Sequence, residues 1–166
     1  MLALEFIHDF CLSDEPDYAV ERCHLSLLDL LDIAAAETKT RLSAIIRDHN
    51  CKEFGGHVPT LFDYRYSSTQ GVALAAGMTI DSLDGHDGFK PAKGHIGCSL
   101  FHAIFCIALE MDIKGEEFLS ALLMGYEFSA RASRSQHSTV PDYHTVGSWV
   151  ALTAGATFAR LMRLTP

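Results

Sequence analysis

Cysteine is scarce in this sequence, and the spacing of the few cysteines does not suit a cross-linked framework. The five are odd in number and include no CxxC pair: Cys11, Cys23, Cys51, Cys98 and Cys106. A disulfide scaffold or a zinc knuckle is therefore not indicated. We expect free thiols in a reducing, cytoplasmic setting.

Clustered positive charge is also missing. Thirteen lysines and arginines stand against 21 aspartates and glutamates, which gives a formal net charge of -8. Because nucleic-acid binding depends on clustered cations that neutralise phosphates, we expect no nucleic-acid partner. An acidic substrate would need positive charge at one place in the protein, not over its whole surface.

Long hydrophobic runs are absent as well. No uninterrupted apolar run reaches the roughly 18 residues that a membrane-spanning helix needs. The N-terminal stretch MLALEFIHDFCL contains acidic residues and lacks the basic start and the small-residue cleavage site of a signal peptide. We therefore expect no membrane partner.

Strand patterns are the last notable absence, because β-branched residues are sparse and no alternating apolar and polar run occurs. Alanine and leucine dominate instead and favour helices. The sequence predicts an all-α helical bundle that forms one domain over residues 1–166. Helices are predicted over residues 3–11, 116–133 and 149–164, after a cap at Ser13 or Asp14, from Thr38 or Thr40 onward, and from Ser67, Ser68 or Thr69 to residue 80. The almost wholly apolar residues 98–111 predict a further helix that is buried in the middle of the bundle.

Two polar segments, residues 81–97 and 134–148, separate the later helices. The first, DSLDGHDGFKPAKGHIG, gathers three aspartates, two histidines, two lysines and four glycines. If the helices pack in one bundle, the two segments can converge on one pocket. The facing groups would then be Asp84, His86, Asp87, Lys90, Lys93 and His95 on one side, and Arg134, His137, Tyr143 and His144 on the other.

Such a pocket could move protons and bind carboxylates. Carboxylate and imidazole groups held out of bulk water acquire pKa values useful for proton transfer near neutrality. Lysine and arginine side chains would neutralise a carboxylate substrate, and the glycines would let backbone N–H groups approach it. The ordinary alternatives stay open: aspartates often cap loops, lysines keep loops solvated, and His102 suits a hydrogen-bonded core position.

Four motifs occur in order along the chain: LDGHDGFKPAKGHIG, GYEFSAR, PDYHTVGSW and an alanine-rich helix that ends in RLMRL. Together they resemble the MmgE/PrpD family, which contains 2-methylcitrate dehydratase, cis-aconitate decarboxylase and iminodisuccinate epimerase. The resemblance extends from HLSLLDLLDIAAAE onward. It implies a helical domain with a smaller α+β lid domain, an active site in the cleft between them, and neither an organic cofactor nor a metal.

The resemblance also implies which residues form the site. The family pattern Asp-x-Asp-Asp-Thr followed by His-Pro-Gly corresponds to residues 84–88 and 95–97, with His86, Gly88 and Ile96 as departures. Asp84 and His95 then take the family's site positions, and His144 matches the histidine of the later motif. Our hypothesis is that Asp84, His95, Tyr143 and His144 are catalytic. The substrate-binding groups would be His86, Asp87, Lys90, Lys93 and Arg134. The retained pattern is more similar to the epimerase-like branch.

The implied chemistry is removal of a proton next to a carboxylate of a small polycarboxylate substrate. Cations would stabilise the charge that spreads onto that carboxylate. Family members carry a lid domain that is absent here, so we expect sequence to follow Pro166 and the chain alone to be incomplete. Helices that are normally covered would be exposed, and we expect a homodimer.

Two other functions remain open. One is a non-catalytic helical module that dimerises or pairs with a separate C-terminal part. The other is a metal-dependent phosphohydrolase, suggested by the dipeptide formed by His86 and Asp87 in an all-helical protein. Such a dipeptide normally lies within a helix among further ligands, whereas Gly85 and Gly88 flank it here.

Overall fold

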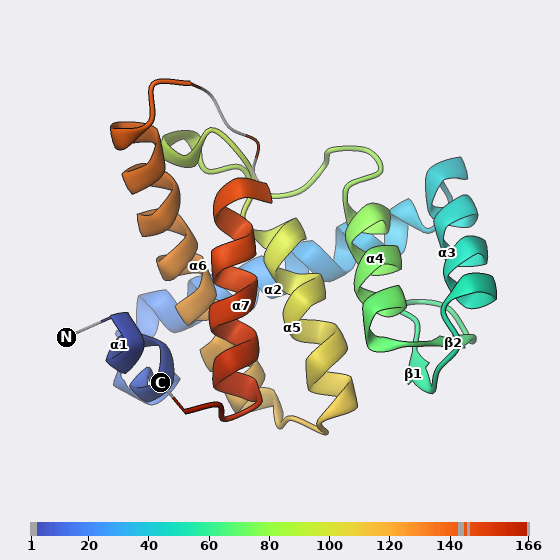
Figure 1. The fold of residues 1–166 in the computed structure, drawn as a ribbon, viewed down its shortest axis with the longest axis horizontal. Helices are drawn as coiled ribbons and strands as arrows, with labels where there is room; N and C mark the ends of the chain where they lie inside the picture. Colours follow the sequence, from blue (N-terminus) through green and yellow to red (C-terminus); the bar gives the residue numbers. More distant parts are fainter. Residues whose placement is uncertain (1–2, 143–144, 146, 166) are drawn as a thin grey trace.

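The computed structural model describes residues 3–142, 145 and 147–165, and these residues are mostly helical (Figure 1). The predicted all-α fold is confirmed. The helices are α1 (Ala3–Asp9), α2 (Asp17–Glu37), α3 (Arg41–Glu53), α4 (Thr69–Ile80), α5 (Gly97–Glu110), α6 (Gly115–Thr139) and α7 (Gly147–Leu161), with short 3-10 turns at Leu12–Asp14 (η1) and Lys90–Ala92 (η2). A small antiparallel pair, β1 (Val58–Pro59) with β2 (Tyr66–Ser67), lies between α3 and α4.

Five helices stand side by side in the order α6, α7, α5, α4 and α3 (Figure 1). Helix α2 crosses behind this row and contacts α4, α5 and α6. The loop at residues 81–97 runs over one end of the row, from the end of α4 to the start of α5 (Figure 1). It therefore reaches several helices that are distant in sequence.

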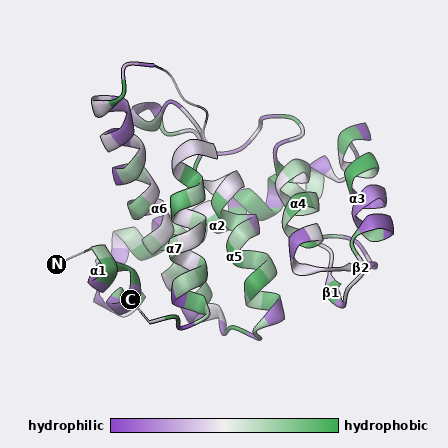
Figure 2. Ribbon diagram, in the orientation of Figure 1, coloured by the Kyte–Doolittle hydropathy of each residue, from purple (hydrophilic) through white to green (hydrophobic). Residues whose placement is uncertain are grey.

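Helix α5 lies in the middle of the bundle, as its almost wholly apolar sequence predicts. Leu100 and Ile104 are fully buried and pack in one cluster with Leu122 of α6 and Trp149 of α7. Figure 2 shows hydrophobic residues along α5 and more hydrophilic ones near the end of α6. Even so, no helix within the described residues is both long and apolar enough to cross a membrane.

Side-chain caps fix where two of the helices begin. Thr40 accepts a hydrogen bond from the Ser43 N–H at the start of α3 (3.1 Å), and Ser68 accepts one from Gly71 N–H at the start of α4 (3.2 Å). Each cap satisfies a backbone donor that has no partner inside the helix. Both residues are among the helix starts that the sequence predicts.

The predicted loop at residues 134–148 is wrong in its first part, because α6 continues through Thr139. No glycine or proline interrupts this part of the chain, and the hydroxyls of Ser138 and Thr139 donate to the Ser135 carbonyl within the last turns. The helix ends just before Pro141, since a residue that precedes proline disfavours helical backbone angles. Arg134 and His137 therefore lie on a helix.

Leu100 offers a direct test of the packing around α5. Replacing this fully buried side chain with alanine leaves a cavity between helices, so we expect Leu100→Ala to lower the free energy of unfolding by about 2–5 kcal/mol in urea denaturation. Leu152→Ala on α7 is the matched control, because that leucine is 63% exposed. Equal losses in both variants would contradict this description of the core.

Candidate functional site

The loop at residues 81–97 is anchored to the start of α5 by Asp87. The carboxylate of Asp87 accepts a hydrogen bond from the Gly97 N–H, at 3.1 and 3.3 Å to its two oxygens. Its backbone carbonyl accepts a hydrogen bond from Nδ1 of His95 (2.6 Å). Asp87 thus caps α5 and orients the imidazole that precedes it.

The surroundings of this cap are tightly packed. A Cβ atom on Gly97 would overlap both the Asp87 carboxylate and the hydroxyl of Tyr126, so this position requires glycine. Burial raises the pKa of the Asp87 carboxyl, although the hydrogen bond from Gly97 opposes this. Burial, together with the nearby Asp87 charge, also raises the pKa of the Tyr126 hydroxyl, which therefore stays protonated near neutral pH.

Next to this anchor, two histidines and two aspartates form a cluster that we call the Asp–His cluster: Asp81, Asp84, His86 and His95. The two imidazole rings meet edge to face with centroids 4.3 Å apart. Oδ1 of Asp84 lies 3.4 Å from His95 Nε2 and 3.8 Å from His86 Nε2. His86 Nε2 also lies 2.9 Å from Oδ1 of Asp81, so these four side chains share one small region.

Burial differs sharply within the Asp–His cluster. The side chain of His86 is fully buried, whereas that of His95 is 32% exposed and that of Asp84 is 77% exposed. Asp84 has a left-handed backbone conformation (φ 56°), which aspartate adopts more readily than most residues. The cluster is therefore open to solvent on the Asp84 side and closed behind His86.

The hydrogen bond to the loop backbone determines the tautomer of His95. A carbonyl oxygen can only accept, so Nδ1 of His95 carries the proton that it donates to Asp87. In the neutral ring Nε2 then holds a lone pair, and this atom faces Asp84. Nε2 is therefore the ring atom of His95 with a free lone pair, and it lies 3.4 Å from the Asp84 carboxylate.

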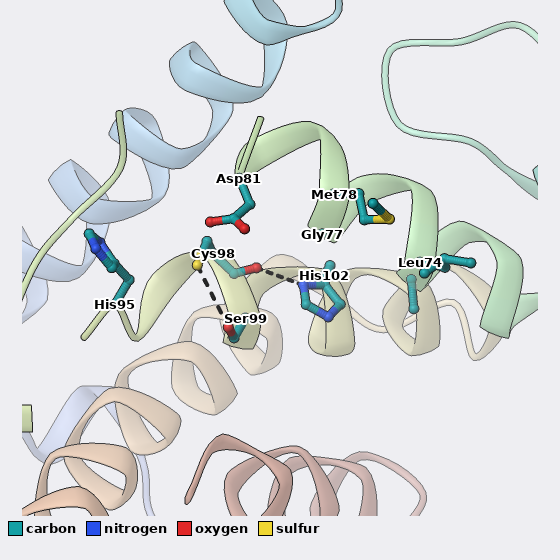
Figure 3. A pocket seen from close by; sticks show the side chains of 9 residues that line it. Leu74, Gly77, Met78, Asp81, His95, Cys98, Ser99 and His102 are labelled. Atoms are coloured by element: carbon teal, nitrogen blue, oxygen red, sulfur yellow. Dashed lines mark hydrogen bonds between the residues drawn. The ribbon is translucent and has the colours of Figure 1, made fainter. Parts of the chain in front are cut away.

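A pocket between α4 and α5 opens next to the Asp–His cluster (Figure 3). Its volume is about 320 Å³. Asp81 and His95 line its polar end, and Leu74 and Met78 of α4 line an apolar wall (Figure 3). A ligand in this pocket could reach His95 while an apolar part of it contacts α4.

His102 and Cys98 of α5 also line the pocket but are poorly suited to proton transfer or attack. Nδ1 of His102 donates to the Cys98 carbonyl (2.6 Å), and burial lowers the pKa of this histidine, so its ring is neutral. A Cβ atom on Gly77 would meet the His102 ring, and this glycine allows α4 to approach it. Burial also raises the pKa of the Cys98 thiol to about 11, which disfavours the nucleophilic thiolate.

The predicted cations lie away from the Asp–His cluster. Lys90 begins the turn η2 and Lys93 directly follows it, and both are exposed. This turn packs against α6, where His137 Nε2 bonds to the Ala92 carbonyl (2.8 Å). Arg134 lines a separate shallow pocket there with Pro91 and His137. The two polar segments therefore meet at η2, and the pocket at Asp81 and His95 is lined from α4, α5 and the loop.

The predicted site residues thus fall into three groups. Asp84, His86, Asp87 and His95 come together at the start of α5, whereas Lys90, Lys93 and Arg134 lie toward the end of α6. Tyr143 and His144 lie outside the described residues. Nothing in the structure tests the roles assigned to these residues.

Sequence reasoning did not single out three residues that the structure places at the site. Asp81 is the first residue of the loop, and Tyr126 belongs to the motif GYEFSAR, but neither was a candidate. His102 was interpreted as a core histidine, and it is indeed hydrogen-bonded, yet it also lines the pocket. The spacing of four between Cys98 and His102 on one apolar helix could have placed both on the same face.

The pKa of Cys98 predicts how its thiol reacts. We expect iodoacetamide to modify the half-buried Cys11 and Cys51 before Cys98 at pH 8, and labelling of Cys98 to rise about tenfold per pH unit below its pKa of about 11. Mass spectrometry of the labelled peptides measures this order, with Cys98→Ser as the assignment control. Labelling of Cys98 as fast as Cys51 at neutral pH would contradict this environment.

Comparison with known proteins identifies the family. Searches of curated proteins and of solved structures returned no match. A family model described as the MmgE/PrpD N-terminal domain matches residues 3–166. That match covers almost the entire sequence, including both polar segments and α5. The chain therefore belongs to the MmgE/PrpD family, through its N-terminal domain.

Proposed function

We propose that this chain carries part of the active site of an MmgE/PrpD isomerase or lyase, which removes a proton next to a carboxylate of a small polycarboxylate. The observation that carries the proposal is the orientation of His95. Its Nδ1 proton is donated to the Asp87 carbonyl, its Nε2 atom faces Asp84, and the residue lines the polar end of the pocket. A general base needs such a free nitrogen on a ring that is held in place.

His95 takes the substrate proton at Nε2 in this proposal. The imidazolium that forms keeps its bond to the Asp87 carbonyl and gains a charged neighbour in Asp84, 3.4 Å from Nε2. Because Asp84 is largely exposed, this stabilisation is modest, and the backbone bond contributes mainly by holding the ring in place. Return of the proton to the same carbon from the other face would give epimerisation, whereas loss of hydroxide from the neighbouring carbon would give dehydration.

The substrate carboxylates need positive charge, which the described lining of the pocket does not contain as lysine or arginine. Lys90 and Lys93 precede His95 by five and two residues and are exposed. We assign them, with Arg134, to the substrate carboxylates that extend out of the pocket. His144 or Tyr143 would complete proton transfer on the opposite face of the carbon.

The sequence supports the epimerase-like branch within this proposal. Gly88 stands where the family pattern has a threonine, which removes a hydroxyl from the site. The closest neighbour that a side chain at position 88 would meet is His95, at 3.9 Å, so this side of the imidazole is open. A hydroxyl that could assist departure of a leaving group is absent at this position.

Substitution of His95 tests the proposed base. Asparagine keeps an N–H donor at the position of Nδ1 but has no atom at the position of Nε2. We expect His95→Asn to slow deuterium incorporation next to the carboxylates of 2-methylcitrate or iminodisuccinate at least about 100-fold. NMR in deuterated buffer measures the exchange, with the full product of the gene as the enzyme.

His57→Asn is the matched control, because the His57 side chain is 84% exposed and pairs with Glu110 on another part of the surface. It should exchange the substrate proton at the wild-type rate. Undiminished exchange in His95→Asn would remove this histidine from the mechanism. Absence of exchange in the folded wild-type protein with both substrates would overturn the proposed reaction.

The second candidate function is a helical module that associates with another copy of itself, and one observation favours it. Tyr18, Leu25 and Leu28 lie at helical spacing on one face of α2 and are 71%, 47% and 63% exposed. Aligned apolar side chains of this kind are typical of surfaces that become covered on association. This interface is compatible with catalysis but does not require it.

A charge in the middle of this face tests the proposed dimer. We expect Leu28→Asp to shift the protein from dimer to monomer in sedimentation velocity, since the aspartate would lose its hydration in the interface. Leu152→Asp on α7 introduces the same charge at a leucine of equal exposure, 63%, and should leave the dimer intact. A monomeric wild-type protein would contradict the interface.

A further inference from the structure

We propose that Asp84, His86 and His95 form a binding site for a divalent transition-metal ion of the Zn²⁺ type. This site lies within the proposed active site, so the inference rests on the same cluster but adds a ligand to it. The resemblance to the family implies no metal, and the proposal arises from the geometry of the three side chains.

The distances between the three ligand atoms suit one tetrahedral ion. Bonds of about 2.0–2.1 Å to nitrogen and oxygen place neighbouring ligand atoms about 3.4 Å apart in a tetrahedron and about 2.9 Å apart in an octahedron. Oδ1 of Asp84 lies 3.4 Å from His95 Nε2 and 3.8 Å from His86 Nε2. All three ligand atoms lie within 4.8 Å of one another. Small side-chain rotations would bring Nε2 of His86 and Nε2 of His95 to the same spacing.

The hydrogen bond from His95 Nδ1 to the Asp87 carbonyl is of the kind that orients metal-binding histidines. A ligating histidine almost always donates its other N–H to a carboxylate or a carbonyl, which fixes the tautomer and directs the free nitrogen at the ion. His95 donates Nδ1–H to the Asp87 carbonyl at 2.6 Å. Its Nε2 lone pair is therefore directed toward Asp84, which offers only acceptor atoms when ionised.

His86 can bind an ion through Nε2 only if its ring proton moves to Nδ1, which gives up the hydrogen bond from Nε2 to Asp81. Its side chain is fully buried, and Nδ1 has no hydrogen-bond partner among the described residues. Nε2 lies 2.9 Å from the Asp81 carboxylate. When the ring proton moves to Nδ1, Nε2 can bind an ion, and the Asp81 carboxylate is close enough to become a fourth ligand in place of water.

The charge of the cluster also favours a cation. The carboxylates of Asp81 and Asp84 both face His86, and the backbone carbonyl of Asp87 lies on the Nδ1 side of His95. Two nitrogen ligands with carboxylate oxygen suit Zn²⁺, which shares this ligand set with Fe²⁺. The spacings of 3.4 and 3.8 Å are nearer to the tetrahedral value than to the octahedral one. A bound ion would occupy Nε2 of His95, so metal binding and proton uptake at that atom exclude each other.

Titration of the metal-free full gene product with Co²⁺ tests the site, because tetrahedral Co²⁺ has an intense visible spectrum and Zn²⁺ should displace it. We expect one Co²⁺ per chain. Asp84→Asn and His95→Asn should each weaken binding at least about tenfold, since each removes a ligand. Asp84→Asn suits the left-handed backbone, and His95→Asn keeps the donor to Asp87, so both variants should fold.

Asp112→Asn is the matched control, since Asp112 is also exposed and left-handed (φ 52°) but lies outside the cluster. It should bind Co²⁺ as the wild type does. Wild-type protein without a tetrahedral spectrum, or equal affinity in Asp84→Asn and His95→Asn, would overturn the metal site. Proton exchange in metal-free protein without Co²⁺ binding would refute only the metal site, whereas Co²⁺ binding without exchange would refute only the proposed reaction.

Discussion

The attachment of one aspartate to the first turn of α5 determines the geometry of the whole site. Asp87 uses its carboxylate to accept the Gly97 N–H and its carbonyl to accept Nδ1 of His95. The two bonds have different roles: the first satisfies a helix end, and the second orients an imidazole. Because both come from one residue, the ring of His95 is fixed relative to α5, the most deeply packed helix of the bundle.

This attachment depends on a close approach between elements. The Asp87 carboxylate and the Tyr126 hydroxyl can both reach the start of α5 because Gly97 has no side chain. Tyr126 lies on α6, so the anchor also connects the loop to a second helix of the row. Burial of this connection raises the pKa of Asp87 and of Tyr126. The side chains of Asp84 and His95 are thus largely and partly exposed, while the groups that support them are more deeply buried.

The sequence predicted the helices well and the site only in part. Apolar composition and hydroxyl caps at Thr40 and Ser68 are local signals, and the structure confirms the fold class and both caps. Clustering of Asp84, His86 and His95 was also within reach, since all three lie in one short segment. The sequence could not predict that the lysines lie apart from this cluster, because their position depends on how η2 packs against α6. The continuation of α6 to Thr139 was missed because serine and threonine hydroxyls bond within the helix there.

The polarity of the pocket bears on which end of a ligand reacts. Its apolar wall at Leu74 and Met78 gives no hydrogen bonds to a carboxylate, and Asp81 would repel one at the polar end. A small polycarboxylate would therefore place its carboxylates toward Lys90 and Lys93 and its C–H group toward His95. A cation at the Asp–His cluster reverses this preference, because it attracts a carboxylate to the atom that would otherwise accept the proton. Whether Nε2 of His95 is free or holds an ion would thus decide which part of the ligand meets it.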